Sequence, residues 1–345
     1  MLYGMRMNKR LLEVAQFAGV SEATARRALN GSHLVAPATR ERVLTALDVL
    51  GLPRPSGQGE GRSLLVGVVV PDLRNPVFPA FAEAITSRLN KRGLVPVLCT
   101  RTSDGVSEAN YIEMLLAQNI GGIVFIGSSY ADAGAEQGAA LKDRQVPLVL
   151  INPADENADA VQISADDADA VHQVLTHLTA MGHERIGLLI GPVGHVPSAR
   201  KLAAFAAFWK ARQVPSGTWM PLVGHSLFAM EAGALTVGRL LEEGATAVVC
   251  GSDELALGAV RGARRLGLDI PGDVSVTGFD DSLLMGAVDP PLTTCRQPVD
   301  RMADAAMEAL ALQMQGQRAE PGVTLFQTQL IVRSSSGRPG RRSGR

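Results

Sequence analysis

The sequence predicts an α/β protein in two parts, a small helical N-terminal domain and a larger body built from parallel sheets. Three observations lead to this prediction. A helix-turn-helix pattern with paired arginines occupies the first fifty residues, a Gly- and Pro-rich stretch follows it, and seven short apolar runs then alternate with amphipathic segments. With 345 residues, 46% of them hydrophobic, the chain is long enough to bury several cores.

Charge is distributed unevenly between the two parts. The formal net charge is -1, yet residues 1–62 hold nine Lys and Arg against five Asp and Glu. Residues 63–337 hold 20 Lys and Arg against 29 Asp and Glu. The N-terminal part is therefore where a polyanion such as nucleic acid is expected to bind.

Composition argues against several protein classes. No apolar run approaches the roughly 18 residues of a membrane span, and the basic N-terminus lacks a signal-peptide pattern, so we expect a cytoplasmic protein. The three cysteines, Cys99, Cys250 and Cys295, are odd in number and far apart. They fit neither a disulfide framework nor a metal site, and we expect buried thiols with no metal and no cofactor.

The stretch "LLEVAQFAGVSEATARRALNG" predicts a helix, a tight turn and a second helix. Gly19 supplies the turn, Ser21 is a ready N-cap, and Asn30-Gly31 ends the second helix. A third helix follows. Together they predict a helix-turn-helix domain over residues 8–52, with an apolar side formed by Leu11, Leu12, Val14, Ala15, Ala18, Val43, Leu47 and Leu50.

The second helix carries the residues that suit DNA. Arg26 and Arg27 stand together with Thr24 beside them, and these residue types serve base edges and phosphates. An ordinary three-helix bundle would keep the same core, but it would not need basic residues on the exposed side of this helix.

The sequence pattern of the body, residues 64–333, predicts doubly wound parallel sheets. Its strands are apolar throughout and separated by helices, as in sheets that are covered on both faces. The repeated units are too many for one ordinary sheet, and "DAVQIS" near residue 160 marks a crossing into a second lobe. We expect an N-lobe over 64–162 and 298–324, a C-lobe over 163–297 and 325–333, and a disordered basic tail over 334–345, with weak phosphate contact as the alternative role of the tail.

Polar residues follow several of the predicted strands. In parallel sheets such residues meet at one edge, where ligands bind. Singly, Asp253 or Asp280 could cap the next helix, and His195 could be an ordinary loop residue. Carboxylates, a cation and an aromatic ring converging on one cleft indicate a carbohydrate-type site instead, with the candidates Asp72, Asn75, Phe78, Asp166, Asp167, His195, Ser198, Arg200, Lys201, Ser252, Asp253, Phe279, Asp280 and Asp281.

The text "EVAQFAGVSEATARRALNG", followed by "TRERVLTALDVLGL", resembles the DNA-binding headpiece of the lactose-repressor (LacI/GalR) family of bacterial transcription regulators. Further similar segments follow in the family's order, so that the resemblance runs from Leu11 to Arg333. They are "VVVPDLRNPVF", "GHERIGLL", "LALGAVRGARRLGLDIPGDVSVTGFDDS" and "DPPLTTCRQP". The lobes also resemble periplasmic sugar-binding proteins, which implies a periplasmic-binding-protein-like body.

The resemblance implies roles for residues of the second helix, which enters the major groove in that family. Glu22, Ala23 and Arg27 match the base-reading positions, and Thr24 and Asn30 match positions that touch the DNA backbone. Arg26 adds a charge that the family normally lacks at this position. The full set of DNA-binding candidates is Ser21, Glu22, Ala23, Thr24, Arg26, Arg27 and Asn30.

The resemblance also implies effector contacts from Phe78, Asp166, Lys201 or Arg200, Phe228, Ser252, Asp253 and Asp280. With the strand-end residues Asp72, Asn75 and His195, they make eleven effector-binding candidates. The family's usual Asn-Asp pair is Ser252-Asp253 here, and its ligand arginine aligns with either Arg200 or Lys201. Because Arg is a bidentate fork and Lys a point charge, this choice bears on effector chemistry.

The function implied is a regulator, with a repressor favoured over an activator, that binds pseudo-palindromic operator DNA as a homodimer, a tetramer being left open. A small effector, a sugar or related metabolite, would bind between the lobes. Three alternatives remain: a sensor that has lost operator binding, a sugar-binding transport protein, and an enzyme using its paired carboxylates and His195. The enzyme lacks support because no GxSxG, HExxH, GxGxxG or GKS/GKT pattern is present.

The linker, residues 53–63, departs most from the family, whose "YxPNxxARxL" text forms a hinge helix on the operator. Leu52 replaces the tyrosine, Arg54-Pro55 replaces the Pro-Asn pair, and Gly57, Gly59 and Gly61 disfavour helix. We expect a flexible tether rather than a stable hinge helix, the alternative being a diverged helix that forms only on DNA.

Overall fold

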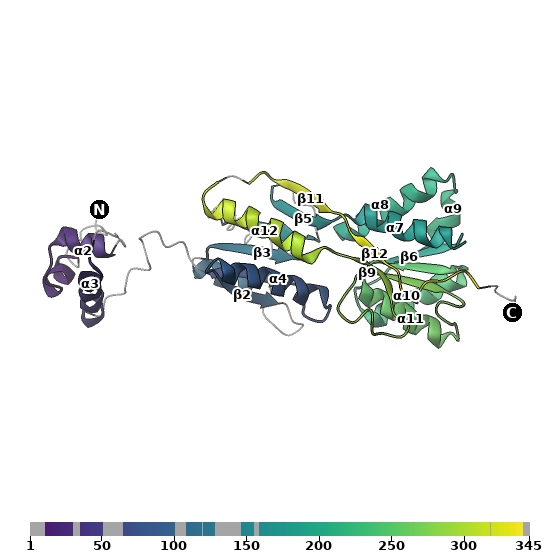
Figure 1. Ribbon diagram of the computed structural model, residues 1–345, viewed down its shortest axis with the longest axis horizontal. Helices are drawn as coiled ribbons and strands as arrows, with labels where there is room; N and C mark the ends of the chain where they lie inside the picture. Colours follow the sequence, from purple (N-terminus) through teal and green to yellow (C-terminus); the bar gives the residue numbers. More distant parts are fainter. Residues whose placement is uncertain are drawn as a thin grey trace. The chain divides into compact units, whose positions relative to one another are not determined.

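A computed structural model describes residues 11–29, 35–50, 65–100, 108–118, 120–127, 146–154, 159–317 and 319–340. The chain divides into two compact units, Met1–Leu64 and Leu65–Arg345, each with its own cores (Figure 1). Asn30, the linker 53–63 and the last five residues of the predicted tail lie outside the described residues.

The first unit is helical, as predicted. Residues 11–17 form a helix, Gly19 makes the turn at φ +64°, and two helices follow, α2 (Glu22–Leu29) and α3 (Pro37–Val49). Leu12 and Leu50 are 46% and 36% exposed, so their assignment to the apolar side was wrong. The core is made of small and branched side chains that let the helices approach closely: Val14, Ala15, Ala18, Ala25, Ala28, Val43, Ala46 and Leu47.

The first sheet of the second unit is wholly parallel, with the order β11-β5-β4-β3-β1-β2. Strands β1, β2, β3 and β4 were predicted as buried strands, and β2 is instead an exposed edge, with Val95 48% and Leu98 49% exposed. The strands are β1 (Leu65–Val70), β2 (Val95–Thr100), β3 (Gly122–Ile126), β4 (Leu148–Ile151), β5 (Val161–Ala165) and β11 (Gly322–Phe326).

The second sheet has the order β12-β10-β9-β8-β6-β7. Its strands are parallel except β12, which runs antiparallel to β10. Three of them, β6, β8 and β9, match predicted strands and are buried along their whole length. The strands are β6 (Ile186–Ile190), β7 (Val223–His225), β8 (Ala247–Cys250), β9 (Ser275–Asp280), β10 (Thr293–Arg296) and β12 (Gln329–Ile331).

Alternating side chains of the strands pack against helices on opposite faces. Val66, Val68 and Val70 of β1 pack in a core with α4 (Val77–Lys91) and α12 (Val299–Met314), whereas Val69 packs in another with α5 (Glu108–Ala117). In the second sheet, α7 (Asp167–Ala180) and α8 (Val196–Ala211) belong to one core, and α10 (Met230–Glu242) and α11 (Asp253–Arg265) to another. Two short elements, α9 (Ser216–Trp219) and η1 (Met220–Leu222), lead into β7.

The chain crosses between the two sheets three times: between β5 and α7, between β10 and α12, and between β11 and β12 (Figure 1). Crossings were predicted after residues 162, 297 and 324. The first and third lie slightly later, because β5 and β11 complete the first sheet before the chain leaves it.

The C-terminal segment differs from its prediction. Residues 334–340, which were assigned to a disordered tail, pack against the second sheet. Ser335 is fully buried, and its hydroxyl donates to Val276 O at 2.6 Å and accepts from Thr293 N at 2.8 Å. His183 Nε2 lies 2.8 Å from Gly337 O. The polar composition hid these contacts, since buried hydroxyls and one imidazole stabilise the segment instead of apolar side chains.

Helices α10 and α11 pack backbone against backbone through glycine. A Cβ atom at Gly258 would lie 2.3 Å from Met230 O, and one at Gly262 would lie 2.5 Å from Ala234 O. Gly238 of α10, by contrast, faces open space with nothing within 4 Å. A glycine inside a helix lowers helix stability by about 1 kcal/mol relative to alanine. The close approach of the two helices explains why glycine is present at Gly258 and Gly262 in spite of this cost.

These two environments predict opposite effects of the same substitution. Gly258→Ala should lower the free energy of unfolding by about 1–3 kcal/mol, because the added methyl group forces the helices apart. Gly238→Ala should raise it by up to about 1 kcal/mol, because helix propensity improves with no clash. Denaturant unfolding of the two variants checks this, and stabilisation by both would contradict the close packing described here.

Candidate functional site

The second helix of the first unit presents the predicted DNA-binding residues. Ala25 is fully buried in the small core, which fixes the helix, while Arg26 and Arg27 are exposed. Ser21 begins the helix, with its hydroxyl accepting from Thr24 N at 3.2 Å.

The additional arginine of this helix is engaged within the helix itself. Arg26 Nη2 donates to Glu22 Oε1 at 2.8 Å, one helical turn away. Exposed pairs of this kind are worth about 0.3–0.5 kcal/mol, so the pair is easily exchanged for a phosphate contact. No ion pair of Arg27 is recorded among the described residues.

The second unit contains a cavity of about 320 Å³ at the carboxyl ends of both sheets. Its lining comes from loops that follow the strands and from the first turns of the next helices, where parallel strands place ligand sites. Polar and charged lining residues are Asp72, Asn75, Asn152, Asp167, His195, Ser198, Lys201, Ser252, Glu254, Asp280 and Gln297. Apolar and small lining residues are Pro71, Val77, Phe78, Phe81, Ile126, Gly127, Ala154, Pro192, Pro197, Phe228, Gly251 and Phe279.

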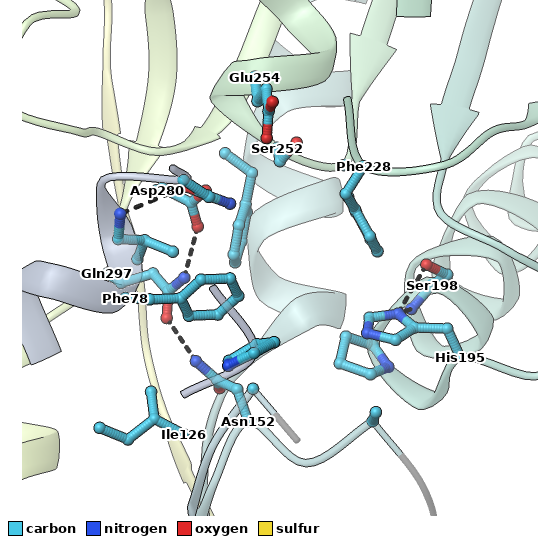
Figure 2. Close-up of a pocket in the computed structure, with 18 of the residues that line it drawn as sticks. Phe78, Ile126, Asn152, His195, Ser198, Phe228, Ser252, Glu254, Asp280 and Gln297 are labelled. Carbon is cyan, nitrogen blue, oxygen red and sulfur yellow. Dashed lines mark hydrogen bonds between the residues drawn. The ribbon is translucent and has the colours of Figure 1, made fainter. Parts of the chain in front are cut away.

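Aromatic rings lie on opposite sides of the cavity. In Figure 2, Phe78 lies beside Gln297 and Asp280, and Phe228 lies on the other side near His195. Each phenylalanine ring packs over a glycine: a Cβ at Gly127 would lie 2.4 Å from Phe78, and a Cβ at Gly191 would lie 2.2 Å from Phe228. Such rings suit the apolar faces of a sugar ring.

His195 is held in place by its own helix. Its Nδ1 accepts from Ser198 N at 3.3 Å and lies 2.9 Å from Ser198 Oγ, at the start of α8 (Figure 2). Its ring meets Phe228 edge to face at 5.0 Å between centroids. The imidazole thus caps a helix and supports an aromatic ring.

Two carboxylates lie where β9 ends. Asp280 is 7% exposed and has a φ of +122°, and its carboxylate accepts from Gln297 Nε2 at 2.6 Å. Burial raises the pKa of Asp280 well above its ordinary value, and the nearby Asp253 carboxylate raises it further. Burial likewise raises the pKa of Asp253 to about 6.

Asp253 serves the structure of the cavity floor. Its carboxylate accepts from Ser282 N at 2.7 Å and from Thr294 Oγ1 at 2.6 Å. Gly278 of β9 lies close to this carboxylate, since a Cβ atom added to Gly278 would be 2.3 Å from Asp253 Oδ1. Asp253 is absent from the described cavity lining for this reason, because its oxygens face inward to the strands.

The cavity contains one ion pair. Lys201 Nζ donates to Asp167 Oδ1, with both side chains about 95% buried, and Nζ lies 3.8 Å from the centroid of the Phe279 ring. Burial raises the pKa of Asp167, and Lys201 opposes that rise. The ammonium is therefore neutralised within the protein before any ligand arrives.

A chain of hydrogen bonds connects the cavity to the crossings between the sheets. Gln297 donates to Asp280 and accepts from Asn152 Nδ2 at 2.8 Å, and Asn152 Oδ1 accepts from Ala165 N at 2.9 Å (Figure 2). Asp166 N donates to Phe326 O at 2.8 Å. The three crossings are thus linked to one another and to the carboxylate of Asp280.

Eight of the eleven effector residues proposed from the sequence line the cavity. They are Asp72, Asn75, Phe78, His195, Lys201, Phe228, Ser252 and Asp280. Asp166, Arg200 and Asp253 are not among the described lining residues. Asp166 instead caps α7 by accepting from Ala168 N and Asp169 N, and its neighbour Asp167 takes the lining position.

The structure distinguishes the two cations that the sequence left open, since Lys201 lines the cavity and Arg200 does not. Asn152, Gln297 and Glu254 also line it, although the sequence did not single them out. Asn152 and Gln297 each follow an apolar or mixed strand, β4 and β10, and that position was the available signal for both.

Within the described residues, no helix is long and apolar enough to cross a membrane. The same residues contain no group of three or more His, Cys, Asp or Glu side chains arranged to hold a metal ion. Cys99, Cys250 and Cys295 are free and buried, as predicted.

Both units match known protein families. Residues 10–52 match the lacI family of bacterial regulatory proteins, and residues 175–336 match the periplasmic binding protein-like domain. A relative from Streptomyces limosus, named an uncharacterized HTH-type transcriptional regulator in the aml 5' region, is 46% identical over 330 residues. That similarity covers 95% of this chain and 94% of the relative.

Two solved structures are similar over nearly the whole chain. A complex of the transcriptional regulator CelR with cellobiose is 27% identical, with a TM-score of 0.70, covering 94% of this chain and 99% of that one. A lac repressor dimer bound to operator and the anti-inducer ONPF is 29% identical, with a TM-score of 0.71, covering 94% and 98% of the two chains.

The headpiece match and the 46% identity to the Streptomyces limosus regulator, over nearly the whole of both chains, show which family this protein belongs to. The chain belongs to the lacI family of bacterial regulatory proteins.

Proposed function

We propose that this protein is a transcriptional repressor that binds pseudo-palindromic operator DNA as a homodimer and responds to a carbohydrate held in the 320 Å³ cavity. One observation carries the proposal. The same chain combines a helix-turn-helix unit, whose second helix exposes Arg27, with a cavity of carboxylates, amides and aromatic rings at the carboxyl ends of two parallel sheets. The operator-bound dimer and the cellobiose complex among similar structures support both halves of it.

Binding to DNA would use two headpieces. A dimer places two recognition helices on two half-sites, and once the first is bound the second binds at a high effective concentration. In each headpiece, Arg27 would read a base edge, with Glu22 and Ala23 beside it, and Thr24 would touch the DNA backbone. Asn30 is proposed for the backbone as well, from the sequence pattern alone.

Effector control would act through the crossings between the sheets. A ligand shifts DNA affinity only by its differential affinity for two arrangements of the lobes. A sugar hydroxyl that donates a hydrogen bond to Asp280 would change the bond that Asp280 accepts from Gln297, by competing with it or by tightening it. Gln297 is in turn hydrogen-bonded to Asn152, which is bonded to Ala165 at the first crossing. The hydrogen-bonded chain gives ligand occupancy a physical route to the angle between the lobes.

The alternatives receive less support. The enzyme alternative is supported by no catalytic motif, since the sequence contains no GxSxG, HExxH, GxGxxG or GKS/GKT pattern. A transport protein has no use for the helix-turn-helix unit. A sensor without operator binding is distinguished only by experiment, because an intact headpiece fold is compatible with weak DNA affinity.

Footprinting of the DNA upstream of its own and neighbouring genes tests the proposal directly. The full-length protein should protect a sequence-selective site, and one or more sugars should change that protection. Arg27→Ala should weaken binding roughly ten- to hundredfold, as expected for one base contact worth about 1–3 kcal/mol. Arg265→Ala, an exposed arginine of α11, is the matched control. No selective protection even at low salt would contradict a regulator of this kind.

The linker is a second target. Replacing Gly57, Gly59 and Gly61 together by alanine should strengthen operator binding if low helix propensity in this segment limits affinity, since each glycine costs about 1 kcal/mol in a helix. Operator affinity is measured by gel shift against the unchanged chain. Equal or weaker binding by the variant would count against a linker that lacks a stable hinge helix.

Asp280 is the key effector residue in this proposal. Asp280→Asn, whose amide oxygen can still accept from Gln297, should leave sugar-free operator protection intact and raise the sugar concentration needed for the response roughly three- to tenfold, because one hydrogen bond is worth about 0.5–1.5 kcal/mol. Asp289→Asn, an exposed carboxylate paired with Arg264, serves as the control. An unchanged response curve for Asp280→Asn would exclude Asp280 as an effector contact.

A further inference from the structure

We propose that the cavity accepts an uncharged saccharide and discriminates against phosphorylated or carboxylated sugars. This inference rests on the proposed function, because it takes the cavity as the effector site, and it adds the charge class of the effector. It follows from how the protein uses its own cations, helix N-termini and carboxylates around the cavity.

The only ammonium among the described lining residues is already paired. Proteins hold phosphate and carboxylate groups mainly with Arg or Lys side chains or with free N–H groups at helix N-termini. Lys201 donates to Asp167 in a buried ion pair, and no arginine is among the described lining residues. An anionic ligand would have to break this ion pair and leave the buried Asp167 with only the coulombic attraction of Arg200 to compensate its charge.

Four helices, α4, α7, α8 and α11, place residues of their first turns in the cavity lining, and side chains of the protein already accept from N–H groups at these N-termini. Asp166 accepts from Ala168 N and Asp169 N at the start of α7, at 3.1 and 3.0 Å. His195 accepts from Ser198 N at the start of α8.

Of the other two helices, α11 is capped by the residue before it, whereas the N-cap residue of α4, Pro76, has no side-chain acceptor and Asn75 Oδ1 accepts from Val77 N at 3.2 Å instead. Ser252 Oγ accepts from Leu255 N at 3.2 Å at the start of α11. Before α4, the Asp72 carboxylate accepts from Arg74 N and Asn75 N at 2.7 and 3.0 Å. In each helix the chain itself supplies the acceptor that a phosphate would otherwise provide.

The remaining charges at the cavity are negative. Asp72 follows β1 of the first sheet, and Glu254 lies in the first turn of α11 beside the second sheet (Figure 2 labels Glu254). Burial raises the pKa of Glu254, and the charge of Asp72 raises it further, so the two carboxylates repel each other across the cavity. Arg74 partly offsets this repulsion but is not a described lining residue. A ligand phosphate would add a third negative charge.

What the cavity offers instead suits hydroxyl groups. Asp280 accepts, Asn152 and Gln297 both donate and accept, and Phe78 and Phe228 provide apolar surfaces. A neutral polyol satisfies these groups without disturbing the Lys201–Asp167 pair or facing the acidic pair.

Ligand screening of the full-length protein tests this inference. Thermal unfolding is measured with neutral glucose, maltose and cellobiose, with anionic glucose 6-phosphate and glucuronate, and with cationic glucosamine. We expect stabilisation by a neutral sugar and none by either anionic sugar. Calorimetry on the stabilising sugar and its charged counterparts should give at least a roughly tenfold difference in affinity, equivalent to about 1.4 kcal/mol.

A double variant separates charge from shape. Asp72→Asn with Glu254→Gln keeps the hydrogen-bonding oxygens and removes both charges, so the affinity for glucose 6-phosphate relative to glucose should rise roughly tenfold. Glu308→Gln, on an exposed position of α12, is the matched control. An unchanged ratio would show that these carboxylates do not set the charge preference.

The outcomes distinguish the two proposals. Tightest binding by glucose 6-phosphate, glucuronate or glucosamine overturns the neutral-ligand inference and leaves the sugar-responsive regulator standing. Stabilisation by none of the six sugars contradicts the carbohydrate effector and this inference together, while operator footprinting still decides whether the protein binds DNA.

Discussion

The hydrogen-bonded chain Asp280–Gln297–Asn152 is the interaction on which the second unit depends, because it lies where the polypeptide crosses three times between two sheets. Each member is buried or partly buried, and each satisfies the next. Asp280 also adopts a backbone conformation with φ of +122°, which non-glycine residues rarely take. A strained backbone and a carboxylate with a raised pKa in one place are typical of residues kept for function rather than for stability.

Around this chain, the protein divides its polar residues between structure and binding. Asp166, Asp253 and His195 satisfy backbone N–H groups or the strands, and Asp167 neutralises Lys201. The cavity therefore has a fixed outline before any ligand binds, and fewer side chains must be ordered on binding. The rings of Phe78 and Phe228 pack directly over Gly127 and Gly191, where any larger residue would collide with them.

Local pattern was sufficient to predict the headpiece helices, seven strands and most of the polar residues of the cavity lining, since buried parallel strands are apolar throughout and ligands gather at their carboxyl ends. It was insufficient for β5, β7, β10, β11 and β12: β7 and β12 have only three residues, β11 is largely exposed, and β5 and β10 contain polar residues such as Gln162 and Thr293. It also missed Ser335, whose burial depends on partners far away in the sequence. The choice between Asp166 and Asp167 could not be made either. Only the start of α7 decides which carboxylate caps the helix and which faces the cavity.

The last part of the chain supplies one edge strand to each sheet, β11 to the first and β12 to the second. After β12, Ser335 forms hydrogen bonds to Val276 of β9 and Thr293 of β10. During synthesis the headpiece, whose contacts are local, emerges and folds first. Neither sheet is complete until nearly the whole polypeptide has left the ribosome. A prematurely terminated chain would thus carry a folded DNA-binding domain on an unfinished body, which exposes sheet edges and marks it for degradation instead of allowing it to occupy an operator without effector control.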